Sequence, residues 1–245
     1  MRLFPLCLIV LMSACAVAKP INDKGPINKS PIPDEVFQST DPLAPPPRVP
    51  SRTAVRNFLS VIDTIETVTE DVCRQRAPQL NCDFLIVYDA NPRAPMNAFQ
   101  KVDETGRPII IFTLALIAEA RNEDELAFVL AHEAAHHIAG HLARQQQAAL
   151  IGATIFGNLA RLSNDPEAVA NAQEFGAALG ARTYSKEFEL EADALGARIA
   201  QLAGYDALRG AEFFFRIPDP GNRFLGTHPP NADRFAVVQK AARGT

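Results

Sequence analysis

The chain has 245 residues, of which 47% are hydrophobic and 21% are charged. This composition is that of a globular protein, and the length suits one good-sized domain or two small ones. A formal net charge of −4 and the lack of basic patches interleaved with aromatic residues argue against a nucleic-acid partner.

The first residues predict an export signal. An arginine precedes an apolar run over residues 3–12, which is too short for a transmembrane helix and suits a secretory signal. Two endings fit a signal within residues 1–18. The residues up to Cys15 resemble a bacterial lipobox, which would make Cys15 a lipidated N-terminus. Residues 16–18 equally suit ordinary cleavage before Lys19. Both endings imply export to the bacterial periplasm, and lipidation would add an outer-membrane anchor.

Residues 19–50 are rich in proline and poor in aromatic residues. Such a segment cannot bury enough apolar surface to order itself, so it predicts an extended, disordered tether. The tether would lead into a domain over residues 51–245.

The first half of this domain predicts one helix and a small sheet. Residues 51–72 carry apolar side chains every three or four positions, which predicts a helix with one core-facing stripe. Residues 83–89 form an apolar run that predicts a short buried strand. Residues 98–102 and 108–112 flank a turn-forming segment and predict a hairpin.

Two cysteines follow the first helix closely. Cys73 and Cys82 are nine residues apart, and in an oxidising compartment they would close a small loop worth about 2 to 3 kcal/mol. The alternative is a pair of buried thiols. Export favours the disulfide.

After a short helix over residues 113–120, a second helix carries a metal-binding motif. Asn122 followed by Glu125 is a capping-box pattern that starts this helix. His132 and His136, four residues apart, lie about 40° apart around the helix axis and can bind one ion.

Glu133 completes the motif because it lies about 100° from the first histidine. This is the layout of a zinc hydrolase, in which two neutral imidazoles hold Zn²⁺ and a carboxylate that is not a ligand takes a proton from the attacking water. On a continuous helix His137 and His141 would point away from the pair. We interpret them as surface or outer-sphere histidines.

Residues 148–156 are strongly apolar but too few to span a bilayer. They predict a core helix, and the alternatives are a mobile lid or a membrane-touching segment. The rest of the chain predicts helices over residues 167–182, 185–202, 206–215 and 232–242, with a loop over residues 218–230.

A catalytic zinc ion needs a third protein ligand beside an open position. One known solution, a histidine six residues after the second at a glycine turn, fails because that position is Leu142. Glu189 and Asp193 lie four apart on one face of a later helix. Glu189 can bind the ion while Asp193 accepts a hydrogen bond from a ligand histidine. Glu187 and Glu191 lie on another face, as solvated charges.

With these residues the chain resembles the HtpX-like zinc metalloendopeptidases, a gluzincin family that includes the CAAX prenyl proteases, and it is closest in kind to the periplasmic members. The resemblance extends from residue 51 to the C-terminus and rests on the motif at 132–136, on residues 184–196 and on residues 227–230. It implies an α+β, mainly helical zincin-type metallopeptidase domain with a small β-sheet. It also implies one Zn²⁺ per chain, held by His132, His136 and Glu189.

The resemblance implies further site residues. His228 and Arg234 would lie across the cleft from the metal and donate to the oxyanion or the substrate backbone. The alternative is a loop histidine and a helix-capping arginine, and His228 could also bind zinc at rest. Asn97, Ala98 and Phe99 resemble the family's substrate strand, although the turn after them lacks the family's glycines.

The resulting prediction is an exported zinc metalloendopeptidase that hydrolyses peptide bonds in unfolded or misassembled cell-envelope proteins. The alternative is a non-proteolytic chaperone-like or assembly factor with the same fold. Glu133 speaks against a purely structural zinc site, which needs no general base. Contact with a membrane would come through a lipid on Cys15 or through residues 148–156.

Overall fold

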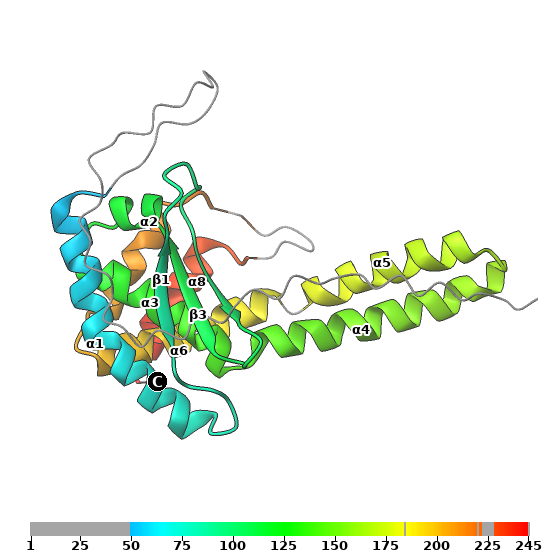
Figure 1. The fold of residues 1–245 in the computed structure, drawn as a ribbon, viewed down its shortest axis with the longest axis horizontal. Helices are drawn as coiled ribbons and strands as arrows, with labels where there is room; N and C mark the ends of the chain where they lie inside the picture. Colours follow the sequence, from blue (N-terminus) through cyan, green and yellow to red (C-terminus); the bar gives the residue numbers. More distant parts are fainter. Residues whose placement is uncertain (1–49, 184, 220, 222–227, 245) are drawn as a thin grey trace, which may run out of the picture. The chain divides into compact units, whose positions relative to one another are not determined.

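The computed structural model describes residues 50–183, 185–219, 221 and 228–244. These residues are mainly helical and include one three-stranded sheet, which confirms the predicted α+β class (Figure 1). The predicted signal with Cys15, and all but the last residue of the predicted tether, lie outside the described residues.

The sheet has the strand order β1–β3–β2, where β1 is Leu85–Asp89, β2 is Ala98–Val102 and β3 is Pro108–Thr113. β1 runs parallel to β3, and β2 runs antiparallel to it, which confirms the predicted hairpin. β1 is an edge strand that buries Ile86 but exposes Leu85 and Tyr88, so the prediction of a buried strand holds for only part of it. β2 forms the other edge, and half of its backbone groups face away from the sheet.

The helix α1 (Arg52–Arg76) covers the core with one side. Ser51 caps it, because the Ser51 hydroxyl accepts a hydrogen bond from the Ala54 backbone N–H. The apolar spacing predicts Leu59 in the buried stripe, but Leu59 is exposed and Val61 is fully buried, and towards the end of the helix Thr69 and Cys73 are buried. A helix of 3.6 residues per turn places position 61 nearer to the centre of the stripe.

The helix α3 (Glu123–Ile138) lies at the centre of the molecule, and α2 (Leu114–Glu119) leads into it from β3. The Asn122 side chain accepts from the Glu125 backbone N–H at 3.0 Å, which confirms the predicted cap. The Glu125 carboxylate in turn accepts from the Arg121 backbone N–H at 2.9 Å.

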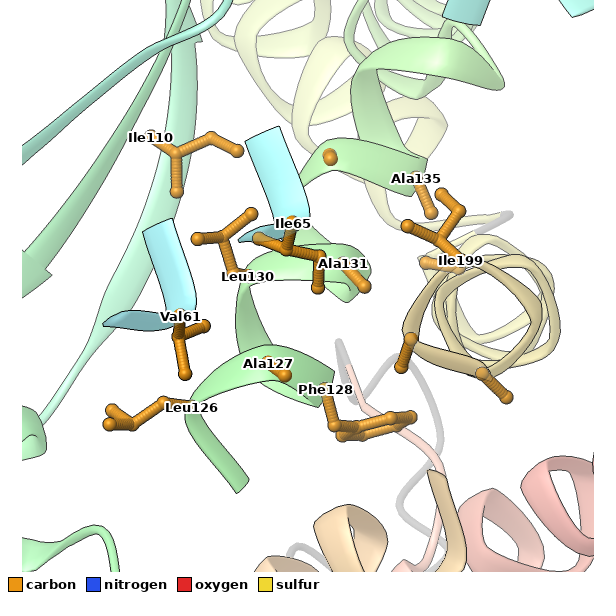
Figure 2. Close-up of a cluster of buried hydrophobic side chains, with 14 of the residues drawn as sticks. Val61, Ile65, Ile110, Leu126, Ala127, Phe128, Leu130, Ala131, Ala135 and Ile199 are labelled. Atoms are coloured by element: carbon orange, nitrogen blue, oxygen red, sulfur yellow. The ribbon is translucent and has the colours of Figure 1, made fainter. Parts of the chain in front are cut away.

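The apolar side chains of α3 fill the space between α1, β3 and α6 (Ser185–Leu202). Figure 2 shows Leu130 near Ile65 and Ile110, and Ala135 next to Ile199 of α6. Because the side of α3 that faces α6 carries alanines, the two helices approach closely. This close approach sets the distance between residues on the two helices.

The helix α4 (His141–Ala160) is not a continuation of α3. Gly140 between them adopts a left-handed conformation with φ of 66°, which changes the chain direction. α4 then packs along α5 (Pro166–Thr183), and Figure 1 shows the two helices side by side.

Small residues bring the backbones of α4 and α5 close together, and Phe156 packs edge-on against Phe175 beside them. A Cβ atom at Gly152 would lie 2.0 Å from the Gly176 carbonyl oxygen, and one at Gly180 would lie 2.1 Å from that of Ala148. Large apolar side chains therefore point outwards, and six of them are more than half exposed: Leu150, Ile151, Ile155, Leu159, Leu162 and Phe175. The prediction of a core helix for residues 148–156 is wrong for this reason.

Within the described part of the chain, we find no helix with the length and apolar character needed to cross a membrane. After α6 the chain forms α7 (Ala207–Ala211), the 3-10 turn η2 (Glu212–Phe215) and α8 (Asn231–Ala242). The predicted helix over residues 206–215 is thus divided in two. Only part of the predicted loop over residues 218–230 is described.

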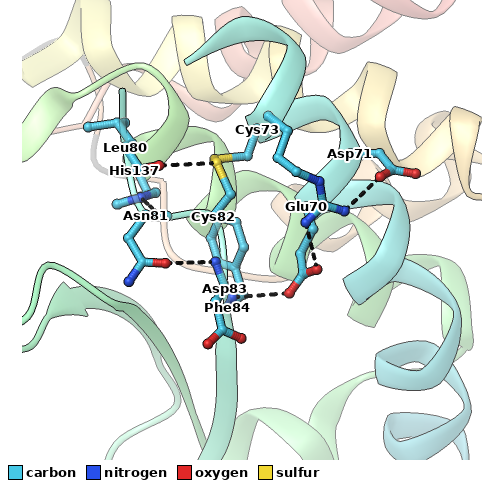
Figure 3. Close-up of a disulfide and its surroundings, with 10 residues drawn as sticks. Glu70, Asp71, Cys73, Leu80, Asn81, Cys82, Asp83, Phe84 and His137 are labelled. Carbon is cyan, nitrogen blue, oxygen red and sulfur yellow. Dashed lines mark hydrogen bonds and ion pairs between the residues drawn. A yellow bond between two sulfur atoms is a disulfide. The ribbon is translucent and has the colours of Figure 1, made fainter. Parts of the chain in front are cut away.

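A disulfide joins Cys73, near the end of α1, to Cys82, and their Cα atoms lie 5.7 Å apart (Figure 3). His137 of α3 contacts this loop, with its Nε2 2.8 Å from the Asn81 carbonyl oxygen and its ring edge-on to Phe84. His137 is buried. It therefore belongs to the structural contact between α3 and the disulfide loop and is not a surface residue.

Candidate metal centre

Three side chains from two helices converge on one point. The Nε2 atoms of His132 and His136, both on α3, lie 3.1 Å apart. The Glu189 carboxylate on α6 has one oxygen 3.4 Å from the Nε2 of His136 and the other 3.7 Å from the Nε2 of His132. The structure thus brings together the three residues predicted as ligands, with their donor atoms within 4.8 Å of one another.

These separations fit a tetrahedral metal ion. Zinc bonds of about 2.0 to 2.2 Å to nitrogen and oxygen separate neighbouring ligand atoms by about 3.3 Å. The 3.1 Å between the two imidazoles and the 3.4 Å from His136 to one Glu189 oxygen lie near this value, and the 3.7 Å from His132 is to the other Glu189 oxygen. Two imidazoles and one carboxylate leave a fourth position open, as in catalytic zinc sites.

A buried ion pair orients the first histidine. The Nδ1 of His132 lies 2.9 Å from an Asp193 carboxylate oxygen, so the Nε2 is directed to the metal position. Burial disfavours a charged imidazole, but the Asp193 carboxylate raises the pKa of His132 overall. Arg234 donates to both Asp193 oxygens at 2.7 and 2.8 Å and lies over the Phe214 ring.

Arg234 is itself buried, and its Nη2 also lies 3.4 Å from the Glu189 carboxylate. Its donors therefore serve Asp193 and Glu189. The predicted role of Arg234 as a donor to the oxyanion or the substrate backbone stays a prediction.

His228 lies at the edge of the site. Its Nδ1 is 3.1 Å from a Glu189 oxygen, and its side chain is half exposed. Burial of Glu189 opposes ionisation, yet hydrogen bonds from His136 and His228 and the charges of His132 and Arg234 hold its pKa well below the usual range. Glu189 is therefore an anionic candidate ligand, and His228 contacts it.

Glu133 follows His132 on α3, and its carboxyl contacts the backbone of β2 at Gln100. Burial raises the pKa of its carboxyl to about 7, while the charge of His132 and a hydrogen bond from the Gln100 backbone act in the lowering direction. A carboxyl that titrates near neutral pH is suited to general base catalysis. The Gln100 contact places this carboxyl directly beside β2.

The register of the hairpin determines which backbone groups of β2 face outwards. Asn97 and Asp103 form backbone hydrogen bonds with the opposite segment. Because bonded positions alternate along an antiparallel pair, Phe99 also bonds inwards, whereas the backbone groups of Ala98 and Gln100 face the outer edge. Of the three predicted substrate residues, only Ala98 has this orientation. Gln100 was not predicted, although the alternation of inward- and outward-facing residues along β2, followed from the turn, would have indicated it.

His141 lies beside the candidate ligand His136, which agrees with the outer-sphere interpretation and not with the surface one. It is 3% exposed, and its Nδ1 lies 2.9 Å from the Nδ1 of His136. Burial lowers the pKa of His141 to about 4, so the ring is neutral at pH 7. The expectation that it points away assumed a continuous helix, which the turn at Gly140 interrupts.

A helix with the motif His-Glu-x-x-His, faced by a glutamate from a later helix, defines a zincin-like metallopeptidase. Comparison with protein families agrees, because residues 63–242 match the model of peptidase family M48. The chain belongs to peptidase family M48.

Curated relatives carry consistent names. The chain is 37% identical over 142 residues to a Vibrio cholerae protein provisionally named a beta-barrel assembly-enhancing protease, a match that covers 52% of this chain and 29% of that protein. It is 30% identical over 152 residues to the beta-barrel assembly-enhancing protease of Yersinia pestis and 28% identical over 148 residues to that of Escherichia coli K12. Both matches cover 54% of this chain and 30% of the relative, so the similarity spans less than a third of these relatives.

Proposed function

We propose that this protein is a zinc-dependent endopeptidase that cleaves extended segments of unfolded or misassembled cell-envelope proteins. The observation that carries the proposal is the convergence of His132, His136 and Glu189 with Glu133 beside the edge strand β2. Family membership and the names of the relatives support the same class of activity.

Each residue has a role that its position supports. Zn²⁺ held by the three ligands would supply the Lewis acidity that activates water and polarises a carbonyl. Glu133 takes a proton from the attacking water and passes it to the leaving amine. Asp193 and Arg234 fix the orientation of His132.

The substrate would bind as an added strand. The backbone groups of Ala98 and the carbonyl of Gln100 face the outer edge of β2, where an extended peptide can form main-chain hydrogen bonds, while the Gln100 N–H donates to Glu133. Main-chain recognition depends little on side chains. Low sequence selectivity is therefore expected, together with a requirement that the cleaved segment be unfolded.

The direct test uses the purified zinc-loaded chain and a reduced, carboxymethylated protein as an unfolded substrate. Wild type should contain about one zinc per chain and cut internally. Glu133→Gln should keep the zinc and lose cleavage by at least about 10²-fold, the scale of general base catalysis. Glu187→Gln, an exposed glutamate on α6, is the matched control. Cleavage by Glu133→Gln at the wild-type rate would refute the mechanism.

The second candidate function is a non-proteolytic chaperone-like or assembly role. The contact of His228 with the ligand Glu189 favours it, because a side chain there narrows access to the site. His228→Ala separates the two functions. If zinc-loaded wild type and His228→Ala both leave the unfolded protein uncut but slow its aggregation, the binding role holds instead.

We also propose that the protein acts at the envelope, with the α4–α5 hairpin contacting lipid. Small residues in the helix contact and large apolar side chains outside are the pattern of helices packed in lipid. No described helix of the hairpin is long and apolar enough to cross a bilayer, so the hairpin would lie in the interface. Flotation with phospholipid vesicles should recover wild type, and recovery should fall when Leu150, Ile155 and Leu159 are all changed to Gln. Leu202→Gln, an exposed leucine on α6, should leave it unchanged. Equal recovery of all three proteins would exclude the hairpin contact.

A lipid on Cys15 would be a second means of membrane attachment, and the mature N-terminus shows whether it is present. Mass spectrometry of the protein from its native envelope distinguishes a lipidated Cys15 from a free Lys19, because the two differ greatly in mass.

A further inference from the structure

The first turn of α4 folds back onto a ligand of the metal centre. On a continuous helix, residues 136 and 141 would lie about 140° apart around the axis and could not meet. The left-handed Gly140 ends α3 and makes His141 the first residue of α4. The Nδ1 of His141 then lies 2.9 Å from the Nδ1 of His136.

The positions of the protons follow from this contact. If the Nε2 of His136 binds the metal, its Nδ1 carries the proton and donates it to the Nδ1 of His141. A neutral His141 then carries its own proton on Nε2, which lies 3.1 Å from a Glu191 carboxylate oxygen. Arg144 donates to the same oxygen at 2.8 Å. Each donor in this series of hydrogen bonds thus has an acceptor. If His136 binds the metal through Nε2, the protons can only be donated from His136 to His141 and from His141 to Glu191.

Packing fixes the plane of the His141 ring. The ring stacks on Phe188 at a centroid distance of 4.5 Å and an angle of 9°. The guanidinium carbon of Arg144 lies 4.3 Å from the centroid of the same phenyl ring. Since Phe188 precedes Glu189 in the chain, this packing connects the start of α4 to the segment that carries the third ligand.

We propose that His141, oriented by Glu191, is the positioning residue that sets the tautomer and ring orientation of His136 for metal binding. The inference rests on the proposed function, because it assumes that His136 binds a metal. The two histidine ligands are then held differently. His132 is held by the buried pair of Asp193 and Arg234, and His136 by an imidazole whose partner Glu191 is half exposed.

The test measures zinc affinity, by competition with a fluorescent chelator at fixed pH. His141→Phe keeps a ring to stack on Phe188 but removes the acceptor, so zinc should bind about 10- to 100-fold more weakly, the range known for groups that orient ligands. Glu191→Ala should weaken binding by a smaller factor, of about 3- to 10-fold on the same scale. Glu191→Gln, which retains an acceptor oxygen, should restore most of the affinity. Glu187→Ala is the control on the same helix.

A spectroscopic measurement tests the proton positions independently. Long-range ¹H–¹⁵N spectra of the zinc-loaded wild type should show His136 protonated on Nδ1 and His141 on Nε2. His141 protonated on Nδ1, or wild-type zinc affinity in both His141→Phe and Glu191→Ala, would overturn the inference. If His141→Phe fails to fold, the half-exposed Glu191 still provides the test. A wild type that binds no zinc would instead refute the proposed function.

Discussion

A single methyl group at Gly196 should disturb the metal centre. This glycine of α6 lies against the backbone of α3, where an added Cβ would stand 2.9 Å from the His132 nitrogen and 3.0 Å from its Cα. Carbon atoms pack at about 3.5 to 4.0 Å, so Gly196→Ala should push the two helices apart by about 0.5 Å. The same helix α6 carries Glu189 and Asp193, and both would move away from His132.

Two effects on stability oppose each other. Alanine favours a helix over glycine by up to about 1 kcal/mol, whereas overpacking against a backbone costs about 1 to 3 kcal/mol. We expect a net loss of about 1 kcal/mol, or about 2 to 4 °C in the melting temperature of the metal-free protein. Displacement of the ligands should weaken zinc binding by about tenfold.

Gly210 offers a matched control. A Cβ atom there would lie 2.5 Å from the Asp124 carbonyl oxygen and 2.6 Å from the Phe128 Cβ, so Gly210→Ala also overpacks against α3. This contact lies one to two turns before the ligands. Both variants should melt at lower temperature, but only Gly196→Ala should bind zinc more weakly in a chelator competition. Equal zinc affinities would show that the helix spacing at position 196 does not govern the site.

Two further predictions concern the elements around the centre. Replacing both Cys73 and Cys82 by Ala should lower the free energy of unfolding by about 2 to 3 kcal/mol. Reductant should shift the urea midpoint of wild type but not that of the variant. An unchanged midpoint in reduced wild type would contradict a stabilising role of the disulfide. Asp193→Ala leaves Arg234 without its buried partner and should cost about 3 to 5 kcal/mol. Arg234→Lys keeps the charge but not the paired hydrogen bonds, so its loss, measured by urea unfolding, should be smaller; a larger loss than that of Asp193→Ala would contradict this account.

The parts of the fold that the sequence predicts correctly depend on local patterns. The cap at Asn122 and the hairpin between β2 and β3 each follow from a few neighbouring residues. The pairing of Glu189 with the two histidines spans more than fifty residues. It was nevertheless predictable, because Asp193 four residues later identifies one face of α6 as the metal side.

The parts that the sequence does not predict depend on one conformation or on what packs nearby. Gly140 has a left-handed φ, and this one angle decides whether His141 points away from His136 or contacts it. Residues 148–156 contain enough apolar side chains for a core position, and hydrophobicity alone cannot show that Leu150, Ile151 and Ile155 stay exposed beside α5. In both cases the missing information is the position of a neighbouring segment.

The α4–α5 hairpin separates the two halves of the metal centre in sequence but not in space. Its first turn contributes His141 and Arg144, and these residues contact Phe188 and Glu191 soon after the hairpin ends. Side chains next to the ligands therefore hold the two ends of the hairpin together, and these contacts do not depend on how long the two helices are. We therefore expect that whole helical turns can be removed from or added to both arms together without moving His136 or Glu189. The hairpin is thus an adjustable insertion, at which a soluble arm, a lipid-binding arm or an engineered docking module can be exchanged while the metal centre stays the same.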